Sequence, residues 1–401
     1  MKNWEECNLE DYIKLIDYRG RTPVKTESGV RLITAKNVKL GYLQLEPQEF
    51  IEASNYKSWM SRGIPNVGDV IFTTEAPLAN VAQIDTNEKL AFAQRIIVMQ
   101  PDPKIIDQTF LKFMLLSENV RKRILGKGTG ATVTGIKSSL LKKIRISFPP
   151  LPEQQRIVAI LDEAFAAIAK AKANAEQNLK NAKELFESYL REVYKSKIHG
   201  VKSDTLISLC ELIVDCEHKT APTQETGYPS IRTPNIGKGK LILENVNRVS
   251  HETYLQWTRR ATPQSGDLIL AREAPAGNIA VIPENVDVCL GQRTVLIRPK
   301  QEKLISKYLA FLILSKDVQE NLLSHSTGAT VEHINMKDIR AFKIYNLPSI
   351  KEQHSIASNI DTLSAETKKL ETIYQQKIND LEELKKSVLQ KAFLGQLTMD
   401  N

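Results

Sequence analysis

The sequence predicts an α+β protein with two mixed α/β domains in a pseudo-twofold arrangement, each followed by a long helix. The two helices are expected to pair as an antiparallel coiled coil. The first observation behind this prediction is an internal repeat, in which Gly29 recurs as Gly227 and Asn37 as Asn235, an offset of 198 positions (227 − 29). The second is a seven-residue apolar repeat that ends each copy. Because this unit far exceeds the roughly 20–50 residues of solenoid repeats, each copy should be a whole domain with its connector.

The repeat also sets the expected domain boundaries. The same offset relates Gly68-Asp69 to Gly266-Asp267, Glu75-Ala76-Pro77 to Glu273-Ala274-Pro275, Gln94-Arg95 to Gln292-Arg293, and Thr129–Val133 to Thr327–Val331. One residue is then inserted, so that Glu153-Gln154 matches Glu352-Gln353. We therefore expect domains at residues 1–150 and 200–348, and long helices within residues 151–199 and 349–401.

Within the first domain, short apolar runs alternate with turn-rich segments. Residues 70–72 and 96–99 are expected to be strands, and residues 144–148 a closing strand. Apolar residues at steps of three and four, from Phe110 to Ile124, predict one helix. The glycine-rich turn Gly126–Gly130 should end that helix. Because this turn lacks the Gly-Lys-Ser/Thr ending of a phosphate-binding loop, no nucleotide site is expected there.

Each long helix has its own start signal. Pro152 is placed for the first turn of the first helix, and Ser349 with Glu352 predicts a capping box for the second. The apolar seams then run from residue 157 to 189 and from 356 to 388. Alanines occupy the middle of the first seam, where the second carries Leu370, Tyr374 and Leu381. Since a small stripe and a large stripe fill space against each other, pairing within one chain is favoured over packing of each helix on its own domain.

Composition and motifs exclude several functions. The 401 residues carry a formal charge of +8, and 42% of them are apolar, which is compatible with a globular protein that binds a polyanion. No segment has the roughly 20 apolar residues of a membrane span and the start is unlike a signal peptide, so we expect a cytoplasmic protein without membrane contact. Neither the cysteines nor the histidines show metal-ligand spacing. Because no nucleophile–base set recurs in both copies, we expect no catalysis, no metal and no bound cofactor.

Several segments, in this order, resemble the specificity subunit of Type I restriction–modification enzymes. They are Gly29–Asn37, Gly68–Asn80, Gln94-Arg95, Thr129–Val133 and Phe148–Gln155, each followed by its second-copy counterpart. The Pro-Leu-Pro-Glu-Gln sequence at residues 150–154 is the most specific single motif, and the second copy diverges mildly there. The order domain, helix, domain, helix is more specific still and covers essentially the whole chain.

This resemblance implies two target-recognition domains, each binding one half of a bipartite, asymmetric site in double-stranded DNA. The long helices would set the spacer between the halves and dock two methyltransferase subunits. Restriction subunits would join these in the full complex. S-adenosylmethionine, ATP and magnesium are then expected on the partner subunits, and the methyltransferase would flip its target adenine out of the base stack.

The repeat suggests which residues read the DNA. A side chain identical in both copies cannot encode a difference between half-sites, so Gln94-Arg95 and Gln292-Arg293 are better candidates for the fold or for phosphate contacts. Base contacts are expected where the copies differ in reachable polar residues. The candidate DNA-binding residues of the first domain are Arg19, Arg21, Thr22, Thr34, Lys36, Thr73, Thr74, Arg95, Lys127 and Thr129. Those of the second domain are His218, Lys219, Thr220, Arg232, Thr233, Arg272, Arg293 and Thr327.

Two other functions stay open at this point. One is an adaptor with two ligand-binding domains that do not bind DNA, and the other is a specificity subunit of a related Type II-like or other defence system. The charge distribution favours DNA, because residues 121–145 contain several lysines and arginines and no acid, whereas acids interrupt the second copy. We therefore expect the first domain to contribute more of the attraction to phosphates.

Overall fold

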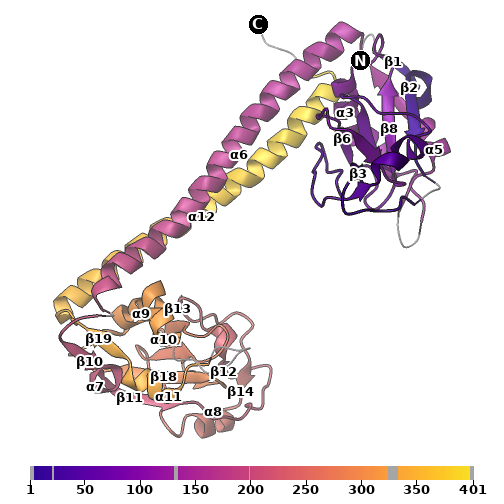
Figure 1. Ribbon diagram of the computed structural model, residues 1–401. Coiled ribbons are helices and arrows are strands. Elements are labelled where there is room, and N and C mark those ends of the chain that lie inside the picture. The colour runs from indigo at the N-terminus through magenta and orange to yellow at the C-terminus, as the bar shows by residue number, and fades with distance from the viewer. Residues whose placement is uncertain (1–3, 20–21, 131–133, 198, 324–332, 398–401) are drawn as a thin grey trace. The chain divides into compact units, whose positions relative to one another are not determined.

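The computed structural model describes residues 4–19, 22–130, 134–197, 199–323 and 333–397, which form two compact units (Figure 1). Unit 1 comprises Met1–Asn174 and Lys377–Asn401, and unit 2 comprises Ala175–Gln376. Two helices of 44 residues, α6 (Leu151–Tyr194) and α12 (Ile350–Phe393), each contribute one part to either unit. The predicted division into four segments stays a prediction, since each unit combines a domain with parts of both long helices.

Unit 1 is built around two sheets. The antiparallel sheet has the order β2 (Ile13–Asp17), β8 (Ile96–Pro101), β5 (Val70–Thr73), β6 (Val81–Gln83). The smaller sheet has the order β4 (Phe50–Ile51), β3 (Val30–Ile33), β7 (Leu90–Phe92), and a further pair joins β1 (Glu5–Asn8) to β9 (Arg145–Phe148). Strands β5, β8 and β9 confirm the three strands predicted for this domain.

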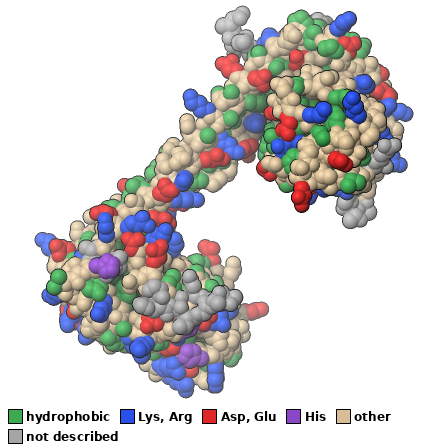
Figure 2. Space-filling view, viewed as in Figure 1, with side chains coloured by type: hydrophobic (Ala, Val, Ile, Leu, Met, Phe, Trp, Pro, Cys, Tyr) green, Lys and Arg blue, Asp and Glu red, His purple; other side chains and the backbone are tan. Residues whose placement is uncertain are grey.

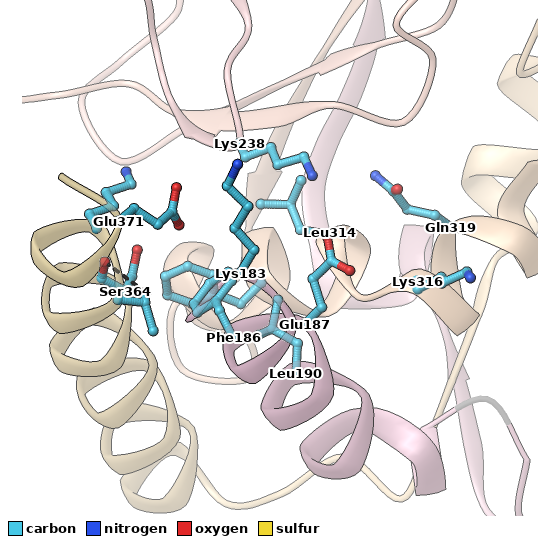
Figure 3. Close-up of a pocket in the computed structure, with 13 residues that line it drawn as sticks. Lys183, Phe186, Glu187, Leu190, Lys238, Leu314, Lys316, Gln319, Ser364 and Glu371 are labelled. Atoms are coloured by element: carbon cyan, nitrogen blue, oxygen red, sulfur yellow. Dashed lines mark hydrogen bonds between the residues drawn. The ribbon is translucent and has the colours of Figure 1, made fainter. Parts of the chain in front are cut away.

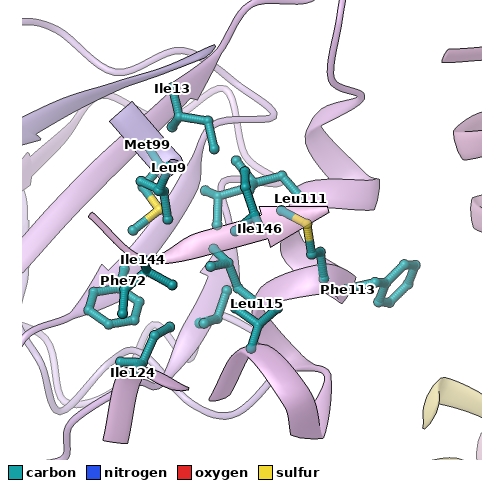
Figure 4. Close-up of a cluster of buried hydrophobic side chains, with 14 of the residues drawn as sticks. Leu9, Ile13, Phe72, Met99, Leu111, Phe113, Leu115, Ile124, Ile144 and Ile146 are labelled. Carbon is teal, nitrogen blue, oxygen red and sulfur yellow. The ribbon is translucent and has the colours of Figure 1, made fainter. Parts of the chain in front are cut away.

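The central strand β5 has a core on each of its faces. Val70 and Phe72 face one hydrophobic cluster, whereas Ile71 faces the other, as the two-residue period of a strand requires. Figure 4 shows Phe72 pointing into the same interior as Leu111 and Leu115 of α3 (Gln108–Leu116). Because both faces of this strand are buried, its successive residues are all apolar, which explains the run at residues 70–72.

Unit 2 repeats this plan with one additional strand. Its larger sheet has the order β11 (Cys210–Asp215), β18 (Thr294–Pro299), β15 (Leu268–Ala271), β16 (Ile279–Val281), β13 (Gly239–Lys240). The smaller sheet has the order β14 (Arg248–Val249), β12 (Tyr228–Ile231), β17 (Cys289–Leu290), and β10 (Ser203–Thr205) pairs with β19 (Lys343–Tyr345). Short helices complete the two units: α1 (Leu9–Tyr12), η1 (Ala53–Asn55), α2 (Tyr56–Trp59), α5 (Ser138–Lys142), η2 (Lys195–Lys197), α7 (Leu206–Leu209), η3 (Thr233–Asn235), α8 (His251–Trp257) and α11 (Met336–Ala341).

The single helix predicted from Phe110 to Ile124 is wrong, because the chain forms two helices there. They are α3 (Gln108–Leu116) and α4 (Glu118–Leu125), separated by Ser117 in an extended conformation with ψ of 144°. The Ser117 hydroxyl donates to the carbonyl of Met114 at 2.6 Å, so its side chain competes with helix continuation. The second copy breaks at the same place, between α9 (Ser306–Leu314) and α10 (Lys316–Leu323). As predicted, α4 ends at the glycine turn.

The two long helices pack antiparallel, as predicted. In unit 1, the start of α6 lies along the end of α12, where Lys172 is ion-paired with Glu382. At the end of the pair, Arg156 donates to the carbonyl of Leu397 at 3.3 Å. Figure 2 shows acidic and basic side chains interspersed along the visible surface of these helices. The capping box that starts α12 also forms, since Ser349 N donates to the Glu352 carboxylate at 2.8 Å.

The predicted seam is only partly buried. Leu185, Leu370 and Leu384 are 51%, 38% and 48% exposed, although each occupies an expected seam position. Ala175 and Ala182, in contrast, are buried as predicted. With 3.6 residues per turn, a straight helix drifts away from a strict seven-residue spacing, so some positions of a long seam turn away from a single partner.

Each long helix ends with an aromatic side chain inside a domain core. Phe393, at the end of α12, packs against Phe110 with ring centroids 5.2 Å apart in unit 1. Tyr194, at the end of α6, packs against Tyr308 at 5.3 Å in unit 2. These two pairs are counterparts under the repeat. Each domain is therefore completed by the helix that starts in the other copy.

A buried glutamine joins each domain to the helix that follows it. Gln154 is fully buried, and its amide oxygen accepts from the backbone N of Asp107 at 2.9 Å. Its amide nitrogen donates to the carbonyls of Ile105 and Pro149, both at 2.8 Å. Gln353 makes the three equivalent bonds in unit 2, to residues 305, 303 and 348, at 2.9, 2.9 and 3.0 Å. This glutamine joint fixes the direction in which the helix leaves its domain.

Candidate nucleic-acid interface

An arginine–glutamate pair stands at the same place in both domains. Glu75 follows β5 and pairs with Arg95, which precedes β8, at 2.9 Å. In unit 2, Glu273 pairs with Arg293 at 2.8 Å. The arginine side chains are 49% and 63% exposed, so each retains N–H groups that point to solvent. An exposed pair of this kind contributes only about 0–1 kcal/mol to stability, and its guanidinium is free to contact a phosphate.

A second arginine, Arg19, is held in place by an ion pair and a hydrogen bond in unit 1. Arg19 pairs with Asp17 at 2.6 Å and donates to the carbonyl of Ile136 at 3.1 Å. Burial alone would raise the pKa of Asp17, but the hydrogen bonds from Arg19 outweigh it and hold that pKa below its ordinary value. Arg19 therefore anchors the neighbouring loop to the strand end, and only part of its side chain is exposed.

Unit 2 makes the same two contacts with an arginine from a different position in the chain. Arg272 pairs with Asp215 at 2.7 Å and donates to the carbonyl of Ile334 at 2.9 Å. Asp215 and Ile334 are the repeat counterparts of the partners of Arg19, but Arg272 is the counterpart of Thr74. The counterpart of Arg19 is Glu217. The guanidinium thus occupies an equivalent place in both domains although it comes from two different loops.

A histidine extends this network in unit 2. Arg272 lies 2.8 Å from Nε2 of His333, and the Nδ1 of His333 lies 3.1 Å from Oε1 of Glu273. Because a guanidinium can only donate, Nε2 must accept and Nδ1 must carry the proton that is donated to Glu273. A neutral imidazole therefore links two ion pairs, Asp215–Arg272 and Glu273–Arg293. Gly135 is the counterpart of His333, so unit 1 has no side chain at this place.

These contacts change the interpretation of Arg272. Its side chain is 9% exposed and its N–H groups bind Asp215, His333 and a carbonyl, which favours a supporting role over contact with a base. Thr73 and Thr74 are likewise buried. Thr73 accepts from the backbone N of Asn80 at 2.9 Å, and Thr74 donates to the carbonyl of Arg95 at 3.3 Å. None of the three presents a free polar group at the surface.

Thr34 and Thr233 are half-buried in the segments that follow β3 and β12. The backbone N and the hydroxyl of Thr34 both donate to Oδ1 of Asn37 at 2.9 Å. Thr233 opens the short helix η3. The counterpart of Thr34 is Arg232, which is exposed.

The other candidates in the described ranges are exposed. In unit 1, Thr22 donates to Gln94 at 3.2 Å, and Thr129 is bridged through its backbone to Gly135. The remaining exposed candidates are Lys36 and Lys127 in unit 1, and His218, Lys219, Thr220 and Arg232 in unit 2. His218 lies 3.2 Å from Asp215. Arg21 and Thr327 lie outside the described residues.

One pair of arginines was missed by the sequence reasoning. Arg62 donates to the backbone carbonyls of Asp17 and Arg19, the latter at 2.6 Å. Its counterpart Arg260 donates to the carbonyl of Cys216 at 3.1 Å. Both are exposed and adjoin the anchored arginine of their domain. Their identity at the 198-residue offset was the signal that could have identified them.

The basic segment of unit 1 is less positive than its sequence suggests. Three of its bases pair with acids from elsewhere: Lys122 with Glu118 at 2.5 Å, Arg145 with Glu6 at 2.9 Å, and Lys142 with Glu10 at 3.8 Å. These pairs reduce the net field that a phosphate would meet. The expected excess of phosphate attraction in unit 1 stays a prediction.

Two features of the residues that the structure describes bear on other kinds of site. Within those ranges, no three histidine, cysteine or acidic side chains are grouped as metal ligands would be. No described helix is both long enough and apolar enough to cross a membrane.

Comparison with known proteins gives one consistent result. Residues 1–180 and 208–383 match the family described as Type I restriction modification DNA specificity domain. The chain is 23% identical to the type I restriction enzyme MjaVIII specificity subunit of Methanocaldococcus jannaschii, over 100% of this chain and 94% of that protein. It is 26% identical to the EcoKI specificity subunit of Escherichia coli K12, over 75% of this chain and 68% of that protein.

Solved structures show the same fold. A chain of a type I R-M system assembly aligns with a TM-score of 0.71 at 19% identity, over 99% of both chains. The HsdS subunit from Thermoanaerobacter tengcongensis aligns with a TM-score of 0.65 at 19% identity, over 99% of this chain and 98% of that one. With the family matched over both copies, the chain belongs to the Type I restriction–modification DNA specificity family and carries the specificity domain twice.

Proposed function

We propose that this chain is the DNA-recognition subunit of a Type I restriction–modification complex, and that each domain reads one half of a bipartite, asymmetric site in double-stranded DNA. The observation that carries this proposal is the pair of equivalent arginine clusters, which share their supporting contacts and differ in their exposed side chains. Arg95 and Arg293 stand at equivalent places, as phosphate contacts would. Exposed residues at matching positions of the two domains differ, for example Lys36 in one and Pro234 in the other, as readers of different half-sites would.

Partner subunits would supply the chemistry. The proposal assigns adenine methylation to two methyltransferase subunits that use S-adenosylmethionine, and cleavage to restriction subunits that use ATP and magnesium. This chain would be non-catalytic, would bind none of these cofactors and would act in the cytoplasm. Its relatives are named specificity subunits of type I restriction enzymes, which supports this division of labour.

The proposal is tested by sequencing the DNA methylation produced by the full chain. The chain is expressed with its cognate methyltransferase subunit in a host that lacks adenine methylation. The expected product is methyladenine in two different short motifs separated by a spacer of fixed length. A palindromic motif would contradict two different readers, and unmethylated DNA despite a soluble complex would contradict the function itself.

Arg293→Ala and Arg95→Ala refine this test. Each variant removes one exposed guanidinium from one domain, so DNA affinity should fall for every sequence while the methylated motif stays the same. A change of motif would instead assign these arginines to base contact.

A further inference from the structure

A pocket opens in unit 2 where the last part of α6 meets the first part of α12 and helices α9 and α10. Its volume is about 440 Å³, within the range of roughly 300–1,000 Å³ that is typical of binding pockets. Its apolar walls come from Phe186, Leu190, Phe311 and Leu314. Its charged side chains are Lys183, Lys238, Lys316, Lys368, Glu187 and Glu371. Figure 3 shows Lys183 and Lys238 reaching toward the same side of the pocket.

In unit 1, the equivalent place is filled by the chain itself. Phe165 of α6 packs edge-on against Phe113, with ring centroids 5.4 Å apart, and Lys385 of α12 lies over its ring at 5.3 Å. Under the repeat, the counterpart of Phe113 is Phe311, which lines the pocket. The counterpart of Phe165 is Ser364, a much smaller side chain that also lines it. The pocket therefore lies where unit 2 lacks the aromatic side chain that unit 1 supplies.

The charges around the two places also differ. The four lysines of the unit 2 pocket correspond in unit 1 to Glu382, Leu40, Glu118 and Ala169. Unit 1 thus carries acidic or apolar residues where the pocket carries these lysines, and it carries Lys386 and Lys172 where the pocket carries Glu187 and Glu371. Four lysines stand against the two glutamates of the lining and Glu320, which pairs with Lys316 at 3.8 Å, so the pocket keeps a small excess of positive charge around an apolar interior.

We propose that this pocket is a docking site for a protein segment that inserts a large apolar side chain flanked by acidic residues. The place of Phe165 in unit 1 indicates the kind of side chain that fits, and the excess of lysines indicates the charge of its neighbours. A nucleic-acid backbone fits less well, because phosphates gain nothing from walls of Phe and Leu.

The segment belongs to the methyltransferase subunit, a step that rests on the function proposed above. Only unit 2 offers the open pocket among the described residues of the two equivalent places, because Phe165 occupies the other. The two methyltransferase subunits therefore bind this chain unequally, and one of them has an anchor that the other lacks.

The test fills the pocket with the side chain that unit 1 uses. Ser364→Phe is introduced into the full chain, and Ser364→Leu serves as a second filling variant. Ser355→Phe is the matched control, because Ser355 is exposed and lies nine residues earlier, on about the opposite face of α12. Calorimetric titration with the methyltransferase subunit measures both binding events, native mass spectrometry counts the bound copies, and circular dichroism checks the fold.

Wild type and Ser355→Phe should bind two methyltransferase subunits, one of them more tightly. Both Ser364 variants should weaken the tighter event by about tenfold or more and leave the weaker event unchanged. Lys368→Ala, which introduces the unit 1 residue, should weaken the same event and reduce its salt dependence.

Equal affinities for wild type and the Ser364 variants would overturn the proposal. An effect of Ser364→Phe without any effect of Lys368→Ala would overturn the acidic character of the segment. If the Ser364 variants change only the affinity for DNA, the pocket serves nucleic acid instead. Failure of the proposed function looks different, since wild-type protein would then bind no methyltransferase at all.

Discussion

The glutamine joint should be among the most sensitive positions of unit 1. Replacing Gln154 by Leu keeps the approximate volume of the side chain but removes one acceptor and two donors. The backbone N of Asp107 and the carbonyls of Ile105 and Pro149 then lose their partner. An unsatisfied buried backbone group costs about 1–3 kcal/mol, and Asp107 and Ile105 are half-buried, so we expect a loss of about 3–5 kcal/mol. That is a large part of the about 5–15 kcal/mol that stabilises a typical domain.

Urea unfolding followed by hydrogen exchange measures this effect in each unit separately. Gln155→Leu is the control, because Gln155 is the next residue of α6 and is exposed. The midpoint of unit 1 should fall for Gln154→Leu and stay unchanged for Gln155→Leu, while unit 2 keeps its midpoint in both. A loss below about 1 kcal/mol for Gln154→Leu would refute the reasoning, since it would mean that water replaces the three bonds at little cost.

Three further predictions follow from the site and the core. Arg272→Thr should destabilise unit 2 by about 3 kcal/mol because the half-buried Asp215 loses its arginine partner and keeps only its contacts with His218 and Cys216, and adding Glu217→Arg should recover part of that loss by recreating the arrangement of unit 1. Equal unfolding midpoints for the single and double variants would contradict this. Arg95→Ala should lower the slope of log K against log salt for DNA binding by about 1, whereas Lys180→Ala on α6 should leave it unchanged. Burial raises the pKa of Cys7 to about 11, so its thiol should resist iodoacetamide at pH 8 until urea is added, and rapid alkylation of the native protein would disprove its burial.

The raised pKa of a second buried thiol, that of Cys210, implies that the stability of unit 2 depends on pH. Burial raises the pKa of Cys210 to about 12, from an ordinary value of 9.0. The folded state thus keeps a proton that the unfolded state releases above pH 9. The contribution of the protonated Cys210 thiol to the free energy of unfolding is therefore fully present below pH 9 and is lost as pH rises from 9 toward 12. Urea midpoints of unit 2 measured at pH 8 and pH 10.5 should show this fall, and a Cys210→Ala variant should show less of it.

Much of the fold could be predicted because its signals are local. The strand at residues 70–72 reads as an apolar run, the capping box of Ser349 and Glu352 is a spacing rule, and the long helices follow from periodicity. The break at Ser117 could not be predicted this way, because the apolar spacing continues through it and only the serine hydroxyl ends α3. The exposure of Leu370 was missed because seven-residue spacing does not show how far the stripe drifts from its partner.

The candidate site was harder to predict, because the argument from the repeat treats each position separately. It separated the repeated Arg95 and Arg293 from the residues that differ between the copies, and their role in phosphate contact stays a prediction. It then assigned Arg272 to base contact because its counterpart is Thr74. In the structure a second pair of counterparts, Arg19 and Glu217, differs in the opposite sense. Each domain therefore has one arginine that binds the equivalent aspartate. Only the fold brings these loops together, so no comparison of aligned positions could show the exchange.

The exchange has a consequence for how such domains diversify. Because the guanidinium can enter from either of two loops, a chain with arginine at both positions is a permissible intermediate, and either one can then mutate without loss of the ion pair. In unit 2 the released position holds Glu217, which pairs with Arg259 and Arg260 at 3.2 and 3.3 Å. A loop next to the candidate interface thus carries opposite charges in the two units, while the aspartate of the supporting strand has an arginine partner in both. Redundancy of this kind lets two domains differ in the charge of an exposed loop while they keep the same supporting ion pair.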